Sequence, residues 1–277
     1  MRPFLLCLLV LVGCSAAPAL KDAGPEDAGS DEVFFKVTGT ARVHPVAAAF
    51  MADAGLDAGL VGLTVRVEEP LKVALSNPDG IFSTQTLDAT GAFSASNISS
   101  LDVSLGVAAG IFDPTDAGTR VVRSATILFD VALQDGKPKK DIAGTAFAVP
   151  VAFHDKLTAT ITDAKIRMIT GNSKGTLLEA GFILGRVVDA TGKPVTGAKI
   201  APTPAGLVSG FFYPTEDLGS LGSVTSANGL FIYVHNGGDV NTFRFNVDAM
   251  PSYNQRNAGA RKEACVVIDV FPGLVAP

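Results

Sequence analysis

One serine in the sequence has a spacing associated with nucleophilic catalysis. Residues 171–175 read Gly-Asn-Ser-Lys-Gly and match the pattern Gly-x-Ser-x-Gly, in which a sharp strand-to-helix turn presents the serine hydroxyl. Asp189 or Asp217, followed by His235, would complete the acid and the base in chain order. The next glycine follows too soon for the required helix, and no alternating strand–helix pattern surrounds the motif. A polar surface turn is therefore the favoured interpretation of Ser173.

The histidines and carboxylates do not form a metal-binding pattern. His44, His154 and His235 lie far apart, and no His-Glu-x-x-His or Cys-x-x-Cys motif is present, so we expect no zinc site. The Asp-Ala-Gly triplets at 22, 27, 53, 57 and 116 lack the alternating oxygen ligands of a calcium loop. The glycine-rich motifs that bind nucleotide phosphates are also missing. The sequence therefore predicts no metal, no cofactor and no enzymatic activity.

An aromatic segment is the strongest candidate for ligand binding. Phe211, Phe212 and Tyr213 lie in a long connection between expected strands, with Tyr233 and His235 expected nearby. Flat rings beside hydrogen-bonding groups recognise both carbohydrates and peptides. Alternatively, the rings close one end of a core, because a chain without tryptophan must fill its core largely with phenylalanine. Both interpretations remain open at this point.

The amino terminus predicts export and attachment of lipid. A positively charged start is followed by an apolar run, Pro3–Val12, which is too short to span a bilayer and is typical of an export signal. The run ends in Leu11-Val12-Gly13-Cys14, which resembles the lipobox of bacterial lipoproteins. The resemblance implies that residues 1–13 are a lipoprotein signal peptide and that the Cys14 thiol is acylated. Residues 14–32 consist mostly of Ala, Asp, Gly, Pro and Ser, with almost no large side chain, and are predicted to be a lipidated, flexible tether.

The lipoprotein resemblance implies a location and a set of partners. Acyl chains on Cys14 would hold the protein on a membrane, at about 0.8 kcal/mol for each buried methylene. Ser15 is not the aspartate that retains lipoproteins at the inner membrane of well-studied bacteria, which favours the outer membrane, on its periplasmic or surface face. Envelope proteins or glycans are the expected partners. The formal charge of -5 counts against nucleic acid, because phosphate binding needs clustered Lys and Arg. The alternative is an ordinary secretory signal with a chance cysteine.

A single cysteine would remain in the mature chain. Removal of Cys7 and acylation of Cys14 leave Cys265, which then has no partner for an internal disulfide. Cys265 lies in an apolar, β-branched run, so we predict a buried and inert thiol.

From Val33 onward, the sequence predicts an all-β fold. Short runs rich in Val, Ile, Phe and Thr alternate with turn sequences that contain Gly, Asn and Asp. Residues 149–161 are ambiguous, since their alternating apolar positions suit a strand, whereas Pro150 and the spacing of positions 153, 157 and 161 suit a helix. At most one short helix is expected, in this connecting segment.

Repeated segments indicate an internal duplication. The first copy has a longer connection, residues 46–61, than the second. Two copies of one strand-turn-strand plan predict two β-sandwiches in tandem. The paired segments are Val37–Val43 with Ile183–Val188, Gly62–Val67 with Gly197–Ile200, and Asp88–Phe93 with Ser226–Phe231.

The second copy resembles a known family. Gly185–Ile200, followed by Thr225–Phe231, is similar to the carboxypeptidase regulatory-like domain, a transthyretin-like (immunoglobulin-like) β-sandwich. The likeness covers about residues 181–271, and the first copy matches in outline only. It implies a first, divergent sandwich with a connecting segment at 33–180 and a second sandwich at 181–277.

These observations predict a non-enzymatic, lipid-anchored protein of the cell envelope that acts as a structural or adhesive interaction module. The alternative is a glycan- or peptide-binding lipoprotein that uses loops of the second sandwich. A hydrolase acting through Ser173 is the third possibility.

Overall fold

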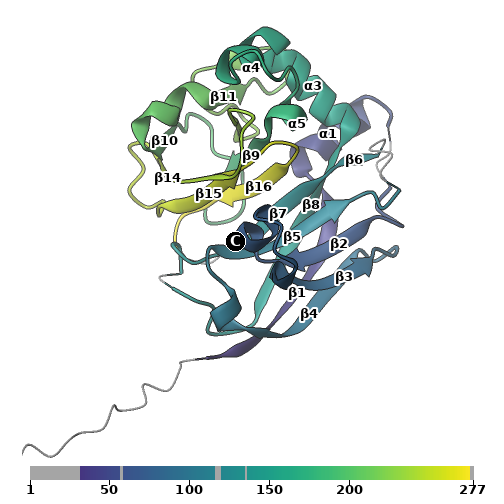
Figure 1. Ribbon diagram of the computed structural model, residues 1–277. Coiled ribbons are helices and arrows are strands. Elements are labelled where there is room, and N and C mark those ends of the chain that lie inside the picture. The colour runs from purple at the N-terminus through teal and green to yellow at the C-terminus, as the bar shows by residue number, and fades with distance from the viewer. Residues whose placement is uncertain (1–31, 57–58, 116–119, 135, 275–277) are drawn as a thin grey trace, which may run out of the picture. The chain divides into compact units, whose positions relative to one another are not determined.

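The computed structural model describes residues 32–56, 59–115, 120–134 and 136–274 (Figure 1). The helices are α1 (Pro45–Asp53), α2 (Pro70–Ala74), α3 (Val151–Ile161), α4 (Asp163–Ile169) and α5 (Leu177–Ala180), with 3-10 turns η1 (Pro78–Gly80), η2 (Ser100–Asp102) and η3 (Ala205–Gly210). The strands are β1 (Phe34–Val43), β2 (Thr64–Glu68), β3 (Ile81–Thr86), β4 (Ala92–Ser99), β5 (Gly106–Phe112), β6 (Val121–Val122), β7 (Ser124–Asp130), β8 (Ile142–Pro150), β9 (Phe182–Val187), β10 (Ile200–Thr203), β11 (Phe211–Pro214), β12 (Leu221–Gly222), β13 (Leu230–Val234), β14 (Asn241–Val247), β15 (Arg256–Ala260) and β16 (Cys265–Val270).

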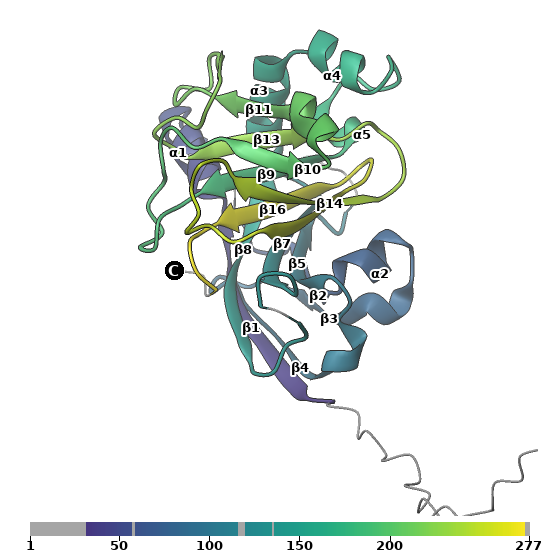
Figure 2. The same cartoon turned by 90° about the vertical axis from the view of Figure 1, so that its left-hand side faces the viewer.

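The fold is mostly β-sheet, with sheets packed in the manner of a sandwich. The central sheet has nine strands in the order β12-β11-β13-β9-β16-β7-β5-β2-β3 (Figure 2). A four-stranded sheet, β4-β1-β8-β6, and a three-stranded sheet, β10-β14-β15, pack against it. The prediction of β-sheet layers is confirmed at this level.

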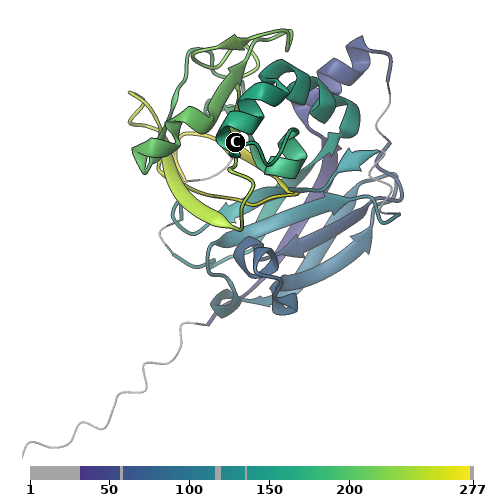
Figure 3. The ribbon, with the colours of Figure 1, turned by 45° about the horizontal axis from the view of Figure 1, so that its top comes forward.

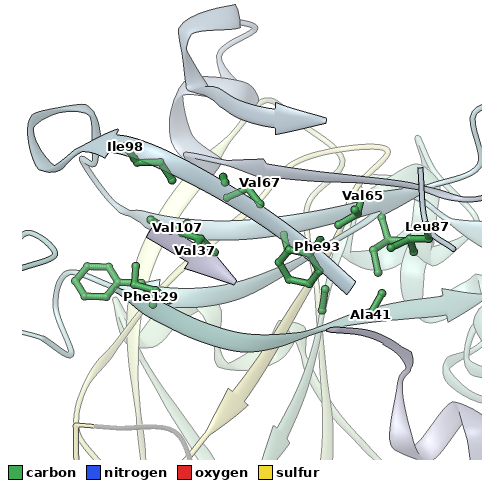
Figure 4. Close-up of a cluster of buried hydrophobic side chains, with 14 of the residues drawn as sticks. Val37, Ala41, Val65, Val67, Leu87, Phe93, Ile98, Val107 and Phe129 are labelled. Atoms are coloured by element: carbon green, nitrogen blue, oxygen red, sulfur yellow. The ribbon is translucent and has the colours of Figure 1, made fainter. Parts of the chain in front are cut away.

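The four-stranded sheet covers one face of strands β2, β5 and β7. Alternate residues of these strands point into a shared apolar core, as expected for strands with one buried face (Figure 4). The core side chains labelled in Figure 4 are Val37, Ala41, Val65, Val67, Leu87, Phe93, Ile98, Val107 and Phe129.

The other end of the central sheet is buried on both faces. Leu184 and Val267, from β9 and β16, belong to a cluster with α1, α3, α4 and α5. Their neighbours Ile183 and Ile268 belong to a second cluster, with the three-stranded sheet. The helices therefore lie on one face of β9 and β16, and β10, β14 and β15 lie on the opposite face (Figures 1 and 3).

The predicted repeats occupy equivalent strands. β1 pairs antiparallel with β4 and parallel with β8, and β9 pairs antiparallel with β13 and parallel with β16. The runs β2-β5-β7 and β10-β14-β15 are both antiparallel throughout. The copies are continuous with each other, because β7 pairs in parallel with β16, and Ser124 lies opposite Cys265. One sheet thus crosses the predicted boundary at residue 180.

The structure contains more helix than the sequence predicted. β8 ends at Pro150 and α3 begins at Val151, so residues 149–161 are a strand end followed by a helix. The 153, 157, 161 spacing marks the buried face of that helix. The expectation of one short helix was wrong, since α1 also lies in the supposed connection 46–61. Its alanines favour helix, and Pro45 suits the first turn.

Candidate functional site

A cleft opens on the face of β2, β5 and β7 that points away from the four-stranded sheet. Its floor includes Gly110, Ala125 and Val266, which are register neighbours on β5, β7 and β16. One wall is α2, and the other is β15 with the start of β14. The cleft encloses about 80 Å³. Sites for small molecules usually enclose about 300–1,000 Å³, so this cleft suits one inserted side chain or chain end.

The α2 wall is fixed by Glu69, which is fully buried. Its carboxylate caps the helix by accepting a hydrogen bond from the Lys72 backbone N–H. The other carboxylate oxygen accepts from the Leu105 backbone N–H at 2.9 Å, which holds α2 beside the start of β5. Arg261 donates to the Ala74 carbonyl at 3.3 Å and so links the end of β15 to the end of α2.

A buried ion pair holds β15 to β7. Arg256 Nε lies 3.2 Å from Asp130 Oδ2, and the two side chains are 3% and 1% exposed. The same carboxylate oxygen accepts from the Asn257 backbone N–H at 2.8 Å, and Arg256 also donates to the Asp269 carbonyl at 2.7 Å. These hydrogen bonds satisfy the charged groups of both Arg256 and Asp130. The ion pair therefore fixes the distance between β15, which is a wall of the cleft, and β7, which is part of its floor.

Glu68 is a buried carboxylate beside the cleft. The residue is 6% exposed and lies over Gly110, where an added Cβ would be 3.4 Å from Oε1. Glu68 is among the residues that line the cleft. Burial raises the pKa of Glu68, and the positive charges of Arg123, Arg66 and Arg261 partly oppose that rise.

Two of these arginines lie on one aromatic ring. The guanidinium carbons of Arg66 and Arg123 are 5.0 Å and 5.6 Å from the centroid of Phe112, within cation–π distance. Arg66 Nε is buried without a hydrogen-bond partner. A buried N–H of this kind normally has an acceptor, so this donor is an exception, and Arg66 is not among the residues that line the cleft.

The predicted aromatic residues are core side chains. Phe211, Tyr213 and Tyr233 are 7%, 5% and 4% exposed and pack in the cluster beneath the three-stranded sheet. The Tyr213 hydroxyl accepts from the Ile200 backbone N–H at 2.8 Å, and Phe212 packs half-buried on the helix side. Of the two interpretations, these positions match the one in which the rings close the core.

Ser173 and its supposed partners do not form a catalytic group. The Ser173 hydroxyl donates to the Thr170 carbonyl at 2.7 Å. His235 Nδ1 lies 3.3 Å from the Ala180 carbonyl oxygen, and burial lowers the pKa of His235. Asp189 and Asp217 accept hydrogen bonds within their own turns. Ser173 therefore belongs to a polar turn, as the sequence favoured.

The two remaining cysteine predictions have different outcomes. Cys14, the predicted lipidation site, lies outside the described residues, as do the signal peptide and all of the tether before Glu32. Cys265 is 1% exposed, and burial raises its pKa well above the usual value, so the predicted buried thiol is confirmed.

The described ranges hold neither a membrane-spanning helix nor a metal-binding cluster. No helix within residues 32–274, gaps excepted, is long and apolar enough to cross a membrane. In the same ranges, no three His, Cys, Asp or Glu side chains are grouped to hold a metal ion.

The sequence analysis did not identify the cleft residues. A signal for them exists in β2, where Arg66 and Glu68 alternate with the core residues Val65 and Val67. Two charged residues on one face of β2, beside the Gly- and Ala-rich strand β5, indicate that this face differs from an ordinary apolar core face. The register of β2, β5 and β7 is needed before these residues can be assigned to one site.

Comparisons with known proteins do not assign this chain to a family. No family model and no curated protein matches the chain. Structural alignment pairs 87% of the chain with 34% of the Bacillus anthracis TIE protein, at 11% identity and a TM-score of 0.23, so the chain spans about a third of that protein. A mutant of shaft pilin SpaA from Lactobacillus rhamnosus GG aligns at 10% identity and a TM-score of 0.22, over 88% of this chain and 99% of the pilin. A streptococcal ancillary pilin aligns at 9% identity and a TM-score of 0.22, over 87% and 69%. These scores do not establish a shared fold.

Proposed function

We propose that this chain is a non-enzymatic, lipid-anchored protein of the cell envelope whose cleft receives a side chain or chain end of a partner protein. The lipobox resemblance at Cys14 supports the anchor and an outer-membrane location. The resemblance of residues 181–271 to carboxypeptidase regulatory-like domains supports a structural or adhesive role, built from two copies of one sandwich plan.

The observation that carries this proposal is the cleft between α2 and β15. Its walls are held by buried hydrogen bonds and an ion pair, so the shape exists before a partner arrives. A preformed pocket lowers the ordering cost of binding and favours an anchor residue at the centre of a protein interface. Its small volume favours a protein group over a glycan.

A photocrosslinking experiment in the native host tests the interaction. A photoreactive residue replaces Thr242, which is exposed on the cleft rim, or Met168, which is 73% exposed on α4 and serves as a control. We expect one discrete adduct from position 242 and none from position 168. Ala125→Leu, which fills the cleft floor, should abolish the adduct, whereas the volume-conserving Ala125→Ser should retain it. An adduct that survives Ala125→Leu would refute the role of the cleft.

The lipid anchor needs a separate measurement. Cells that express the chain are grown with labelled palmitate, and the protein is recovered from the membrane fraction. We expect label in the wild type, no label in Cys14→Ser, and unchanged label in Cys265→Ser. Unlabelled wild-type protein that keeps its leader would contradict the anchor.

A further inference from the structure

Strand β15 forms one edge of the three-stranded sheet, and this edge borders the cleft. Among the described strands, only β14 pairs with β15, and residues 257–261 line the cleft. An edge strand presents a row of backbone N–H and C=O groups with which a further strand can pair. The ladder with β14 determines which of these groups point toward the cleft.

The backbone groups of Asn257 and Gly259 point away from β14. The Asn257 N–H donates to Asp130 Oδ2, on β7, at 2.8 Å, and therefore not to β14. Because directions alternate along an antiparallel ladder, the Asn257 C=O and both backbone groups of Gly259 point to the same side. Pro202 on β10 agrees with this alternation, because it lacks an N–H and lies opposite Phe245, whose own groups then point to β15. Gly259 therefore offers one donor and one acceptor at the free edge.

The other edge strands of the described sheets are protected against further pairing. β6 and β12 have two residues each, and β10 contains Pro202. β3 is tied to β4 by the Ser83 hydroxyl, which donates to the Ser94 carbonyl at 3.2 Å. β15 has five residues, and its outward positions, Asn257 and Gly259, carry neither a charge nor a proline. This edge therefore remains open to another strand.

A strand added beside β15 would lie over the floor of the cleft. The edge of β15 faces β7, which supplies Asp130, and the floor includes Gly110, Ala125 and Val266. Neighbouring strands lie about 4.8 Å apart, so the next strand position is between β15 and α2. There, every second side chain of the added strand would point to the floor. The cleft encloses about 80 Å³, which gives room for one such side chain.

The charges that line the cleft favour an acidic segment over a basic one. Of the charged lining residues, Asp130 is already paired with Arg256. Glu68 then stands against both Arg123 and Arg261, so positive charges exceed negative charges by one. Arg123 is exposed, and Arg261 follows the end of β15. Complementary charge would therefore lie beside the end of β15.

We propose that the cleft binds an extended segment of the partner protein as an antiparallel strand beside β15, with one apolar side chain on the floor and an acidic residue beside Arg123. The inference rests on the proposed function, since it names the conformation and chemistry of the group that enters the same cleft. In this mode of binding, backbone hydrogen bonds provide affinity and the inserted side chain provides specificity. The antiparallel direction continues that of β10, β14 and β15 and forms the more stable ladder.

The test uses the full chain, purified in detergent, and the peptide acetyl-Glu-Val-Thr-Val-Thr-amide. Its valines form one apolar face of a strand, and its amino-terminal glutamate would lie at the end of β15 in the antiparallel direction. We expect saturable binding in isothermal titration calorimetry, abolished by Ala125→Leu and retained by Ala125→Ser. Replacing the glutamate of the peptide with lysine should weaken binding at least threefold. Arg123→Gln should also weaken binding of the glutamate peptide at least threefold, whereas Arg42→Gln, at an exposed position of β1, should not.

Gly259 provides a matched pair of variants for the backbone contact. Gly259→Pro removes the N–H at the free edge and leaves the ladder with β14 intact, because that N–H points away from β14. Gly259→Ala keeps the N–H, and its added Cβ would make an ordinary contact, 3.7 Å from the Asn241 carbonyl oxygen. We expect Gly259→Pro to weaken peptide binding at least fivefold and Gly259→Ala to change it less than twofold.

Hydrogen exchange of the unsubstituted chain gives a second readout, which decides the question if Gly259→Pro does not fold. Saturating peptide should slow exchange of the Gly259 amide at least tenfold. The amides of β3, an edge strand outside the cleft, should be unchanged. Absence of saturable binding, equal binding of the lysine peptide, wild-type affinity in a folded Gly259→Pro variant, or unchanged exchange at Gly259 would each overturn the proposal.

The two proposals can fail separately. If the peptide does not bind but the adduct at position 242 still depends on Ala125, the strand-pairing inference fails and the interaction function stands. If the peptide binds but no adduct forms in the native host, the interaction function fails.

Discussion

The two copies of the strand plan agree closely where they build the sandwich. The Gly62 N–H donates to the Leu87 carbonyl at 2.9 Å, and the Gly197 N–H donates to the Thr225 carbonyl at 2.8 Å. The return bonds, from the Leu87 N–H to the Leu63 carbonyl and from the Thr225 N–H to the Ala198 carbonyl, are both 2.8 Å. Gly62 and Gly197 also share a positive φ, at 82° and 81°, which glycine adopts without strain.

The copies differ in how their sheets are covered. In the second copy, β9 and β16 are buried beneath helices on one face and strands on the other. In the first copy, the face of β2, β5 and β7 that points away from the four-stranded sheet carries Arg66 and Glu68 and borders the cleft, although the β5 residues on that face are buried as well. The two copies therefore share the strand plan and differ in what covers this second face.

The Asp130–Arg256 pair joins a strand of the first copy to a strand of the second, and its loss should have the largest effect on stability. Arg256→Met would leave Asp130 buried and charged without its cation, so we expect a loss of about 3–5 kcal/mol of unfolding free energy. Urea denaturation measures this loss. The double variant Asp130→Leu/Arg256→Met should recover part of it, although the Asn257 N–H then lacks its acceptor. A single-variant loss below about 1 kcal/mol would contradict a structural role for the pair.

Equivalent glycines provide the next test. An added Cβ at Gly185 would collide with the ring of Phe231, and one at Gly39 would collide with the ring of Phe93 and with the Gly144 carbonyl. Overpacking of this kind costs about 1–3 kcal/mol. We expect Gly39→Ala to lose more stability than Gly185→Ala, because a backbone oxygen cannot move aside as a ring can. Thermal unfolding of both variants checks the order, and the reverse order would contradict the assigned packing.

The two copies differ in polarity at one equivalent position. Thr225 corresponds to Leu87, and its buried hydroxyl accepts from the Ala198 N–H at 2.9 Å and donates to the Val195 carbonyl at 2.7 Å. Thr225→Val removes both bonds, and we expect a loss of about 1–3 kcal/mol. Leu87→Val removes one methylene, and about 1 kcal/mol is expected. Urea denaturation of the two variants should rank Thr225→Val as the more damaging.

The smallest effect concerns Glu68, which has no counterpart in the second copy. Its raised pKa means that the folded state holds the proton more tightly than the unfolded state. Its contribution therefore favours folding below the unfolded pKa and is lost as the pH rises through the folded pKa. We expect Glu68→Gln to increase stability at pH 7, by less than about 1 kcal/mol, and to flatten the pH dependence of unfolding. Glu263→Gln, at an exposed position, should do neither.

The sequence anticipated the local features and missed those that depend on register. Repeated glycines, turns and β-branched runs identified the copies, because these residues determine strands and reversals locally. Helix α1 was missed because its alanines carry little apolar pattern, and only Ala47 and Met51 are buried. The aromatic candidates at 211–213 were core residues, since ring type alone does not separate core from surface. The cleft forms only when β2, β5, β7 and β15 lie side by side in the folded chain. No local sequence pattern predicts that arrangement.

The pairing of β7 with β16 has a consequence for how the molecule folds. Ser124 and Cys265 are neighbours in the sheet although about 140 residues separate them along the chain. Closing so long a loop adds little entropy cost over a shorter one, but contacts of large sequence separation slow folding. We therefore expect the pairing of β7 with β16, the last of the described strands in chain order, to be a late and slow step of folding.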